Sequence, residues 1–550
     1  MLRSGRPWLE WTTALRFGGQ LAQRTGTTLK RSLLAISVGL GVSLIVIGAR
    51  QPMDAARLFA LVFARIREAN VDSLSDSTLY ADAARGLVRE LNDPYADLYS
   101  SQQLAEYNRN ALGNDYGGLG MGIESVSDSI TVTNVFRGSP AAVAGIQAGD
   151  RIVAVDGVSV VGWTTDNTSQ RLTGSVGTAV SVTFVRAGTS RPVQERFVRA
   201  AVHVPAVPYA MLVAPHIGYV PLQRFSATAT EETQAAIERL QRAGATSFIL
   251  DLRGNPGGQL DQALGVTNLF LDVGMPLATV RSRAPTPERY FAERAPTVRG
   301  VPAVVMVDTY TASAAEIVAG ALQDHDRALV VGTPSFGKGL VQTMFPLDGG
   351  WTLKMTTGRW YTPSGRSIHR TRPFEHGHFV SADTGLPPRT AAGVREGRPT
   401  VRSDAGRTLY GGGGIVPDVL TWPDTLSTPE QHFASALVSH AAAAQAALFS
   451  VARDLKSRVP PDFGVRPDWR VAYGARLREA GIPVSPALMD SAGRFVDAIL
   501  TTKVAGLAFG DSAAFSRSVS SDVQLQRALS LLQRSTSLPA LLDAARTTDS

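Results

Sequence analysis

Three apolar runs that end in turns constrain the fold of this chain most strongly. They lie at 246–253 (TSFILDLR), 301–308 (VPAVVMVD) and 328–332 (ALVVG), and the first two lead through short turns into helical segments. Continuous apolar runs of this length are typical of strands buried on both faces, and strands that alternate with helices favour a largely parallel sheet. We therefore expect an α/β core over residues 205–424, in which 351–357 (WTLKMTT) forms a half-buried strand.

Changes of pattern divide the rest of the chain. Residues 51–114 show helical periodicity, whereas 115–204 hold short alternating runs between glycine-rich turns, which predict a small β-domain. Residues 370–413 are rich in Arg, Gly, Pro, Thr and His without periodicity and are expected to form a long surface loop inserted into the core. Residues 425–550 are rich in Ala, Leu and Arg and predict a helical C-terminal extension.

The basic balance of the chain lies almost wholly in residues 1–50. This segment holds seven basic residues and Glu10, a net charge of +6, which leaves +1 of the total of +7 for the other 500 residues. A balanced body argues against a nucleic-acid partner. The uncharged apolar run at 33–49 follows the basic cluster and predicts a membrane anchor with its basic side in the cytoplasm. A cleavable signal peptide and a buried core helix are the alternative interpretations.

A second composition feature limits the chemistry. The chain has no cysteine, so a cysteine nucleophile and cysteine metal ligands are excluded, while the redox compartment stays open.

Ser313 stands where a buried strand gives way to a helix. This geometry exposes a side chain and directs helix N–H groups toward a nearby anion. The alternative is structural, because Ser313 and Glu316 also form the S-x-x-E pattern of a capping box. Asp324 lies eleven residues further on, within about 20° of Ser313 around the helix, and its place near the helix C-terminus suggests a pairing partner or an exposed position.

Lys338 lies between Gly337 and Gly339 in a chain with only five lysines among 54 basic residues. Arginine cannot act as a proton acceptor, whereas a desolvated lysine can lose its proton near neutral pH. Residues 332–338 also match the start of a phosphate-binding P-loop, but Gly339 stands where that loop needs Ser or Thr, so a nucleotide site is not expected.

Histidine offers two further candidates. His325 follows Asp324, but adjacent helical residues diverge by about 100°, so the two cannot both face Ser313 as a triad requires. Residues 375–378 contain Glu375, His376 and His378, which we expect to be solvent-exposed rather than metal ligands. The sequence predicts no metal and no cofactor.

Two motifs in the β-domain resemble a PDZ domain. They are YGGLGMGI (116–123) and GSPAAVAGIQAGD (138–150). The resemblance implies that a C-terminal peptide adds as a strand while loop amides hold its carboxylate. The peptide-binding residues it implies are Gly118, Leu119, Gly120, Met121 and Ile123.

Residues 60–420 as a whole resemble the carboxyl-terminal processing, or tail-specific, proteases. The most specific blocks are ILDLRGNPGG (249–258), TASAAEIVAGALQD (311–324), GTPSFGKGLVQ (332–342) and GIVPDV (414–419). The resemblance implies a crotonase-like α/β protease core, a PDZ domain and cleavage of proteins near apolar C-terminal tails.

The resemblance also assigns roles to residues. It implies that Ser313 is the nucleophile, Lys338 its general base and Gln342 the residue that orients the lysine, with Asp324 as structural support. The oxyanion hole it implies comes from the N–H groups of Ala314 and of Gly257 or Gly258.

Together with the predicted anchor, this resemblance implies a serine endopeptidase held in the inner membrane of a bacterial envelope, with its body in the periplasm. A homodimer or an adaptor partner is left open. The alternatives are an inactive PDZ-based scaffold and an intracellular peptidase.

Overall fold

The computed structural model describes residues 55–108, 114–126, 129–136, 138–186, 191–372, 374–375, 378–379 and 390–546. Two compact units make up the chain, Met1–Gly86 and Leu87–Ser550. The first contains helix α2 (Ala55–Ala69) and the start of α3 (Asp76–Arg89), and the ring of Phe63 stacks on that of Tyr80 at 4.4 Å.

The predicted membrane anchor at 33–49 lies outside the described residues. Within the described part of the chain, no single helix has the length and apolarity needed to cross a membrane. Only the pair formed by α11 (Thr428–Val438) and α12 (Ala441–Leu455), bent by 104°, reaches those criteria together.

A six-stranded sheet forms the centre of the second unit. Its strand order is β10-β11-β12-β15-β16-β23, with every neighbouring pair parallel except β10 and β11. The strands are β10 (Met211–Ala214), β11 (Ile217–Pro221), β12 (Ser247–Asp251), β15 (Ala303–Val307), β16 (Leu329–Gly332) and β23 (Val419–Leu420). The predicted, largely parallel sheet is confirmed, and the three apolar runs supply β12, β15 and β16.

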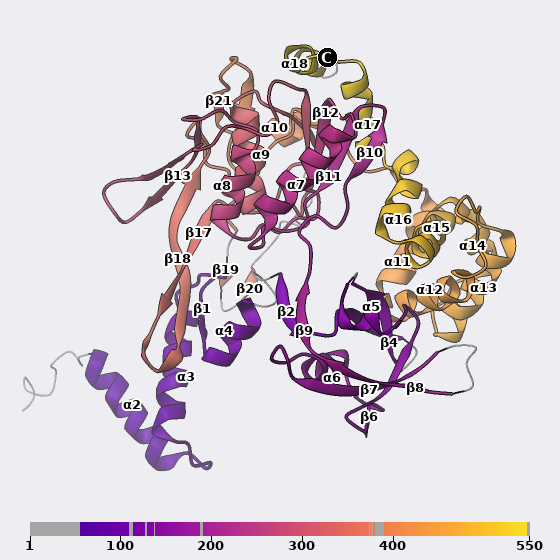
Figure 1. The fold of residues 1–550 in the computed structure, drawn as a ribbon. Coiled ribbons are helices and arrows are strands. Elements are labelled where there is room, and N and C mark those ends of the chain that lie inside the picture. The colour runs from indigo at the N-terminus through magenta and orange to yellow at the C-terminus, as the bar shows by residue number, and fades with distance from the viewer. Residues whose placement is uncertain are drawn as a thin grey trace, which may run out of the picture. The chain divides into compact units, whose positions relative to one another are not determined.

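Both faces of this sheet are covered, as continuous apolar strands require. In β12, Phe248 and Leu250 face the helices α7 (Ala229–Arg242), α8 (Leu260–Asn268) and α9 (Ala314–Asp324), while Ile249 faces the opposite side. That opposite side is covered by α17 (Val523–Gln533) and α18 (Leu538–Arg546) from the end of the chain (Figure 1). The last two helices of the expected C-terminal extension are therefore part of the core.

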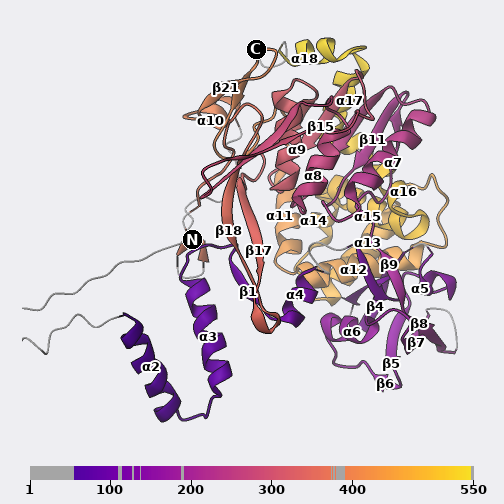
Figure 2. The same ribbon diagram turned by 60° about the vertical axis from the view of Figure 1, so that its left-hand side comes forward.

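An antiparallel sheet lies beside the central one. It has the order β1-β18-β13-β14, with β17 also paired to β18. Its strands are β1 (Asp97–Tyr99), β13 (Pro276–Ser282), β14 (Glu288–Phe291), β17 (Leu340–Pro346) and β18 (Thr352–Tyr361). The hairpin of β17 and β18 runs alongside β1 (Figure 2), and β18 confirms the strand predicted at 351–357. Helix α4 (Ser101–Tyr107) follows β1, and the 3-10 turn η2 (Asp348–Gly350) closes the hairpin.

The β-domain has its own apolar core, centred on buried residues such as Val132, Val182 and Phe184. Its sheet contains β3 (Met121–Val126), β4 (Ser129–Val135), β5 (Arg151–Val155), β6 (Val158–Ser159), β7 (Ala179–Val185) and β8 (Val193–Val198). Two helices accompany it, α5 (Pro140–Val143) and α6 (Thr165–Leu172). Strands β2 (Asp115–Gly118) and β9 (Ala200–His203) pair with each other where the chain enters and leaves the domain.

The remaining helices pack around a separate core that includes Phe433, Tyr473 and Leu500. Besides α11 and α12 they are α13 (Pro467–Glu479), α14 (Pro486–Ser491), α15 (Gly493–Phe509) and α16 (Asp511–Ser518), followed by the turn η3 (Val519–Ser521). The expected α/β class, with N-terminal helices, a small β-domain and C-terminal helices, is confirmed.

The insertion at 370–413 differs from the expected surface loop. Its described part contains β19 (Phe374–Glu375), β20 (His378–Phe379), α10 (Ala391–Arg395), β21 (Thr400–Arg402) and β22 (Thr408–Tyr410). Val394 and Leu409 are buried, and Arg407 forms ion pairs with Asp326 and Asp418. These ion pairs hold the segment against the core. The sequence did not indicate them, because ion pairing produces no apolar periodicity.

Candidate active site

Ser313 occupies a strained turn between β15 and α9. Its backbone has φ 55° and ψ −116°, a left-handed φ that is uncommon outside glycine, and its side chain is half-buried. Thr311 holds the approach to this turn, because its Oγ1 donates to the carbonyl of Leu252 at 2.8 Å. Backbone strain of this kind persists only where surrounding contacts enforce it, and it is common at reactive side chains.

A buried carboxylate links the Ser313 turn to the segment that carries Lys338. Glu316 is fully buried, and its Oε2 accepts from the N–H of Ser313 and of Lys338, both at 2.8 Å. Its Oε1 accepts from Ser335 Oγ at 2.5 Å and from the N–H of Gly337 at 2.7 Å. Burial raises the pKa of Glu316, and these four donors oppose the rise.

The same contacts explain why the P-loop-like segment is not a phosphate cradle. The N–H groups of Gly337 and Lys338, which such a loop would offer to phosphate, donate to the Glu316 carboxylate instead. Glu316 thus does more than the capping box predicted for it: one carboxylate fixes both backbone segments.

The side chain of Lys338 lies over an aromatic ring. Its Nζ is 4.3 Å from the ring centroid of Tyr95, and its carbonyl accepts a 3.1 Å bond from Trp360 Nε1. Among the described residues no hydrogen bond joins Nζ to Ser313. Burial lowers the pKa of Lys338, the charge of Lys354 lowers it further, and the nearby carboxylates oppose both effects.

Lys354 is a candidate site residue to which the sequence analysis assigned no role. It lines the same pocket as Ser313, donates to Tyr99 Oη at 2.8 Å and lies 4.6 Å from the ring centroid of Tyr107. The scarcity of lysine was the one sequence signal that could have indicated it. Burial lowers the pKa of Lys354 as well.

Ser313 opens into a pocket of about 320 Å³. Apolar side chains form much of its wall, including Ile317, Leu340 and Met344. Gln342 also lines the pocket, and its Nε2 donates to Thr356 Oγ1 at 3.4 Å. The charged side chains of Asp261 and Lys354 line the same pocket.

Two backbone N–H groups beside Ser313 are available to a ligand. Ala314 is the first residue of α9, and neither its N–H nor that of Gly258 has a hydrogen-bond acceptor among the described residues. The N–H of Gly257 differs, because it donates to Asn255 Oδ1 at 2.9 Å. A Cβ on Gly257 would lie 2.8 Å from the Cβ of Ser313, so only glycine fits there.

Asp324 lies at the other end of α9, about 16 Å along the helix axis from Ser313. Its Oδ1 is 2.7 Å from Arg366 Nη2, and its Oδ2 accepts from the N–H of Ser364 at 2.9 Å. His325 caps the same helix end, where its ring nitrogens contact Asp404 and the carbonyl of Pro276, both at 2.7 Å. Neither residue lies near the serine.

The metal candidates are only partly described. Glu375 and His378 lie in β19 and β20 and are paired in register, while His376 lies outside the described residues. Across the described part of the chain, no three or more His, Cys, Asp or Glu side chains are grouped to hold a metal ion.

A groove of about 610 Å³ runs between strand β3 and helix α6 of the β-domain. Leu119, Gly120, Met121 and Ile123 line it, whereas Gly118 pairs with Ala200 in the neighbouring two-stranded sheet. The turn at its end is fixed by Gly120, whose carbonyl accepts from Phe136 N–H and Ser139 Oγ. The exposed strand edge and the adjacent loop are the features by which a peptide adds as a strand.

Comparison with known proteins gives matches over the α/β core and over the β-domain. Residues 216–374 match peptidase family S41, and residues 113–185 match the PDZ domain. The carboxy-terminal-processing protease of Bartonella bacilliformis is 38% identical over 314 residues, which are 56% of this chain and 71% of that protein. The carboxy-terminal processing protease CtpA of Bacillus subtilis is 34% identical over 56% of this chain and 65% of its own length.

Solved structures give related matches. The photosystem II D1 C-terminal processing protease is 27% identical, covering 67% of this chain and 88% of its own, with a TM-score of 0.36. The peptide-bound PDZ domain of the carboxy-terminal protease from Vibrio cholerae is 27% identical over 16% of this chain and 99% of its own, with a TM-score of 0.16. The resemblance predicted from the sequence is confirmed by the matches to family S41, the PDZ domain and the two bacterial relatives.

Proposed function

The chain belongs to the carboxy-terminal processing proteases of peptidase family S41, and from this premise we propose that it is a serine endopeptidase with a Ser313–Lys338 dyad. The observation that carries the proposal is the Glu316 carboxylate, which binds the N–H groups of both residues at 2.8 Å. Because one buried carboxylate binds both segments, it fixes their positions relative to each other, as a nucleophile and its base require.

The proposed reaction begins when the neutral amine of Lys338 accepts the hydroxyl proton of Ser313 as the oxygen attacks the peptide carbonyl. The N–H groups of Gly258 and Ala314 donate to the oxyanion that forms. The C–N bond then breaks, the lysine ammonium returns its proton to the leaving amine, and an ester on Ser313 remains. Water, deprotonated by the same lysine, hydrolyses this ester.

This scheme requires the Lys338 amine to leave the ring of Tyr95 and turn toward Ser313. The lowered pKa of Lys338 supports its role as base, because burial and the charge of Lys354 both favour the neutral amine. Gln342 would then orient the amine from its place in the wall of the pocket.

We further propose that the β-domain groove selects the substrate by its apolar C-terminal tail. The tail would add as a strand beside β3, with its carboxylate at the turn formed by Leu119, Gly120 and Met121. Residues 33–49 would hold the protein in the inner membrane, with its body in the periplasm, since the basic side of this segment favours the cytoplasm.

The test is cleavage of an unstructured protein with an apolar C-terminal tail, followed by mass spectrometry of the fragments. The full-length protein should cut it, Lys338→Met should not, and a charged tail should slow the wild-type enzyme. Equal cleavage by Lys338→Met contradicts the dyad. Tail binding without cleavage by the wild type favours the scaffold alternative.

A further inference from the structure

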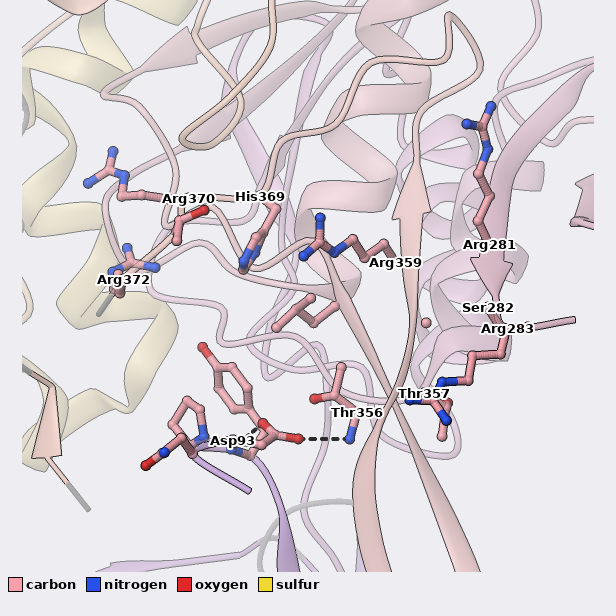
Figure 3. Close-up of a pocket in the computed structure, with 16 residues that line it drawn as sticks. Asp93, Arg281, Ser282, Arg283, Thr356, Thr357, Arg359, His369, Arg370 and Arg372 are labelled. Carbon is pink, nitrogen blue, oxygen red and sulfur yellow. Dashed lines mark hydrogen bonds between the residues drawn. The ribbon is translucent and has the colours of Figure 1, made fainter. Parts of the chain in front are cut away.

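A basic hollow of about 540 Å³ lies beside the candidate active site. Its wall comes from residues 92–95, the end of β13, strand β18 and residues 369–372. In Figure 3, Arg370 and Arg372 lie at the left, Arg359 and His369 in the middle and Arg281 and Arg283 at the right.

One carboxylate, Asp93, lines this hollow together with five arginines. Its two oxygens already accept the N–H groups of Tyr95 and Thr356 at 3.0 and 2.9 Å. Within the described residues, Arg283 and Arg359 form no ion pair, and both side chains are exposed. Because residues 51–550 carry a net charge of only +1, this concentration of arginine is local.

His369 also lines the hollow, close to two of the arginines. Burial lowers the pKa of His369, and the positive charges of Arg359 and Arg372 lower it further, while a backbone contact with Gly337 opposes these effects.

The hollow borders the pocket of Ser313. Leu340 lines both cavities, and the ring of Tyr95, which lines the hollow, contacts the amine of Lys338. A polypeptide held at Ser313 advances about 3.3 Å per residue, so residues a few positions from the scissile bond reach the neighbouring cavity.

We propose that this basic hollow binds acidic side chains of the polypeptide substrate near the bond to be cut. The proposal rests on the proposed function and adds a preference for Asp or Glu close to the cleavage site. Arginine suits this ligand because its planar guanidinium pairs with a carboxylate through two parallel hydrogen bonds. Because Leu340 lines both the hollow and the catalytic pocket, a peptide bound at Ser313 is favoured over a lipid surface or a free anion.

The test measures binding, so it does not depend on catalysis. Full-length Ser313→Ala protein is titrated with fluorescent peptides that share one apolar tail and differ only in Asp or Asn at successive positions. Each peptide is made with a free and an amidated C-terminus, to separate side-chain from terminal carboxylates. We expect one or more positions at which Asp strengthens binding about three- to tenfold at low salt, and less at high salt.

Variants identify the residues responsible. Adding Arg283→Gln and Arg359→Gln should bring the ratio of Asp to Asn affinities close to one. The matched pair Arg239→Gln and Arg242→Gln on α7 removes the same charge from positions outside the hollow and should leave the ratio unchanged. Arg359→Glu should reverse the preference toward a lysine peptide.

Equal binding of Asp and Asn peptides at every position overturns the proposal, as does a preference that survives in Arg283→Gln/Arg359→Gln. So does a preference that depends only on the terminal carboxylate. Arginine-dependent binding of phosphatidylglycerol vesicles, without any acidic-peptide preference, assigns the hollow to a lipid surface instead. Cleavage of the Asn peptide by the wild type is scored separately, because its failure refutes the proposed function and not this inference.

Discussion

Replacing Glu316 by glutamine tests whether one carboxylate positions both candidate catalytic segments. Glutamine has nearly the same shape but one acceptor oxygen in place of two. With that oxygen at the position of Oε2, the bonds from Ser313 and Lys338 remain, while the NH2 group faces Ser335 and Gly337. The Ser335 hydroxyl can turn to accept, but the N–H of Gly337 loses its acceptor.

The magnitude follows from these contacts. One buried donor without an acceptor costs about 1–3 kcal/mol, and two charge-assisted bonds weakened to neutral ones add about 1 kcal/mol each. We expect the free energy of unfolding to fall by about 3–5 kcal/mol and kcat to fall about tenfold to a hundredfold. A second readout separates positioning from simple stabilisation. The negative charge of Glu316 raises the pKa of Lys338, so Glu316→Gln should move the rising limb of the pH–rate profile to lower pH.

The assay is peptide cleavage across a pH series, with thermal unfolding of the same samples. Glu430→Gln is the matched control, because Glu430 closes an equivalent capping box with Ser427 at the start of α11. It should leave kcat and the pH–rate profile unchanged. If Glu316→Gln keeps the wild-type kcat and pH profile, Glu316 is only a helix cap and does not position the catalytic segments.

Three further changes have definite expected outcomes. Because the charge of Lys354 lowers the pKa of Lys338, Lys354→Gln should shift the rising limb of the pH–rate profile toward higher pH. An unchanged rising limb would contradict an electrostatic effect of Lys354 on Lys338. Gly257→Ala places a methyl group against the nucleophile and should lower kcat/KM about a hundredfold. Gly254 also has a positive φ but lies in open space, so Gly254→Ala should not lower kcat/KM. Equal losses in the two variants would point to backbone strain alone. Arg366→Met removes the partner of the buried Asp324 carboxylate at the end of α9. The free energy of unfolding, measured by thermal denaturation, should fall by about 3–5 kcal/mol. A loss below about 1 kcal/mol refutes the pairing.

The central sheet could be predicted because three of its strands, β12, β15 and β16, come from apolar runs. Runs such as FIL (248–250) and VVMV (304–307) place apolar residues on both faces, so the sequence alone requires that both faces of the sheet be covered. What covers the second face was not predictable. Helices α17 and α18 have the ordinary amphipathic pattern, which shows that one face is buried but not what it is buried against.

The candidate site was predictable in its local part only. The step from strand to helix at Ser313 and the scarcity of lysine both indicated reactive residues. The role of Glu316 depends on contacts with residues 335–338, about twenty positions away, and the local S-x-x-E pattern carries no information about them. The buried ion pairs of Arg407 were hidden for the same reason, because the pairing of polar residues leaves no periodic pattern.

The most direct test of Ser313 as the nucleophile compares the full-length protein with its Ser313→Ala variant on an unstructured protein that ends in an apolar tail. Fragments are identified by mass spectrometry after equal incubation. We expect cuts near the C-terminus by the wild type and none by the variant. Equal cleavage by the two proteins would contradict this role of Ser313, because the nucleophile would then lie elsewhere.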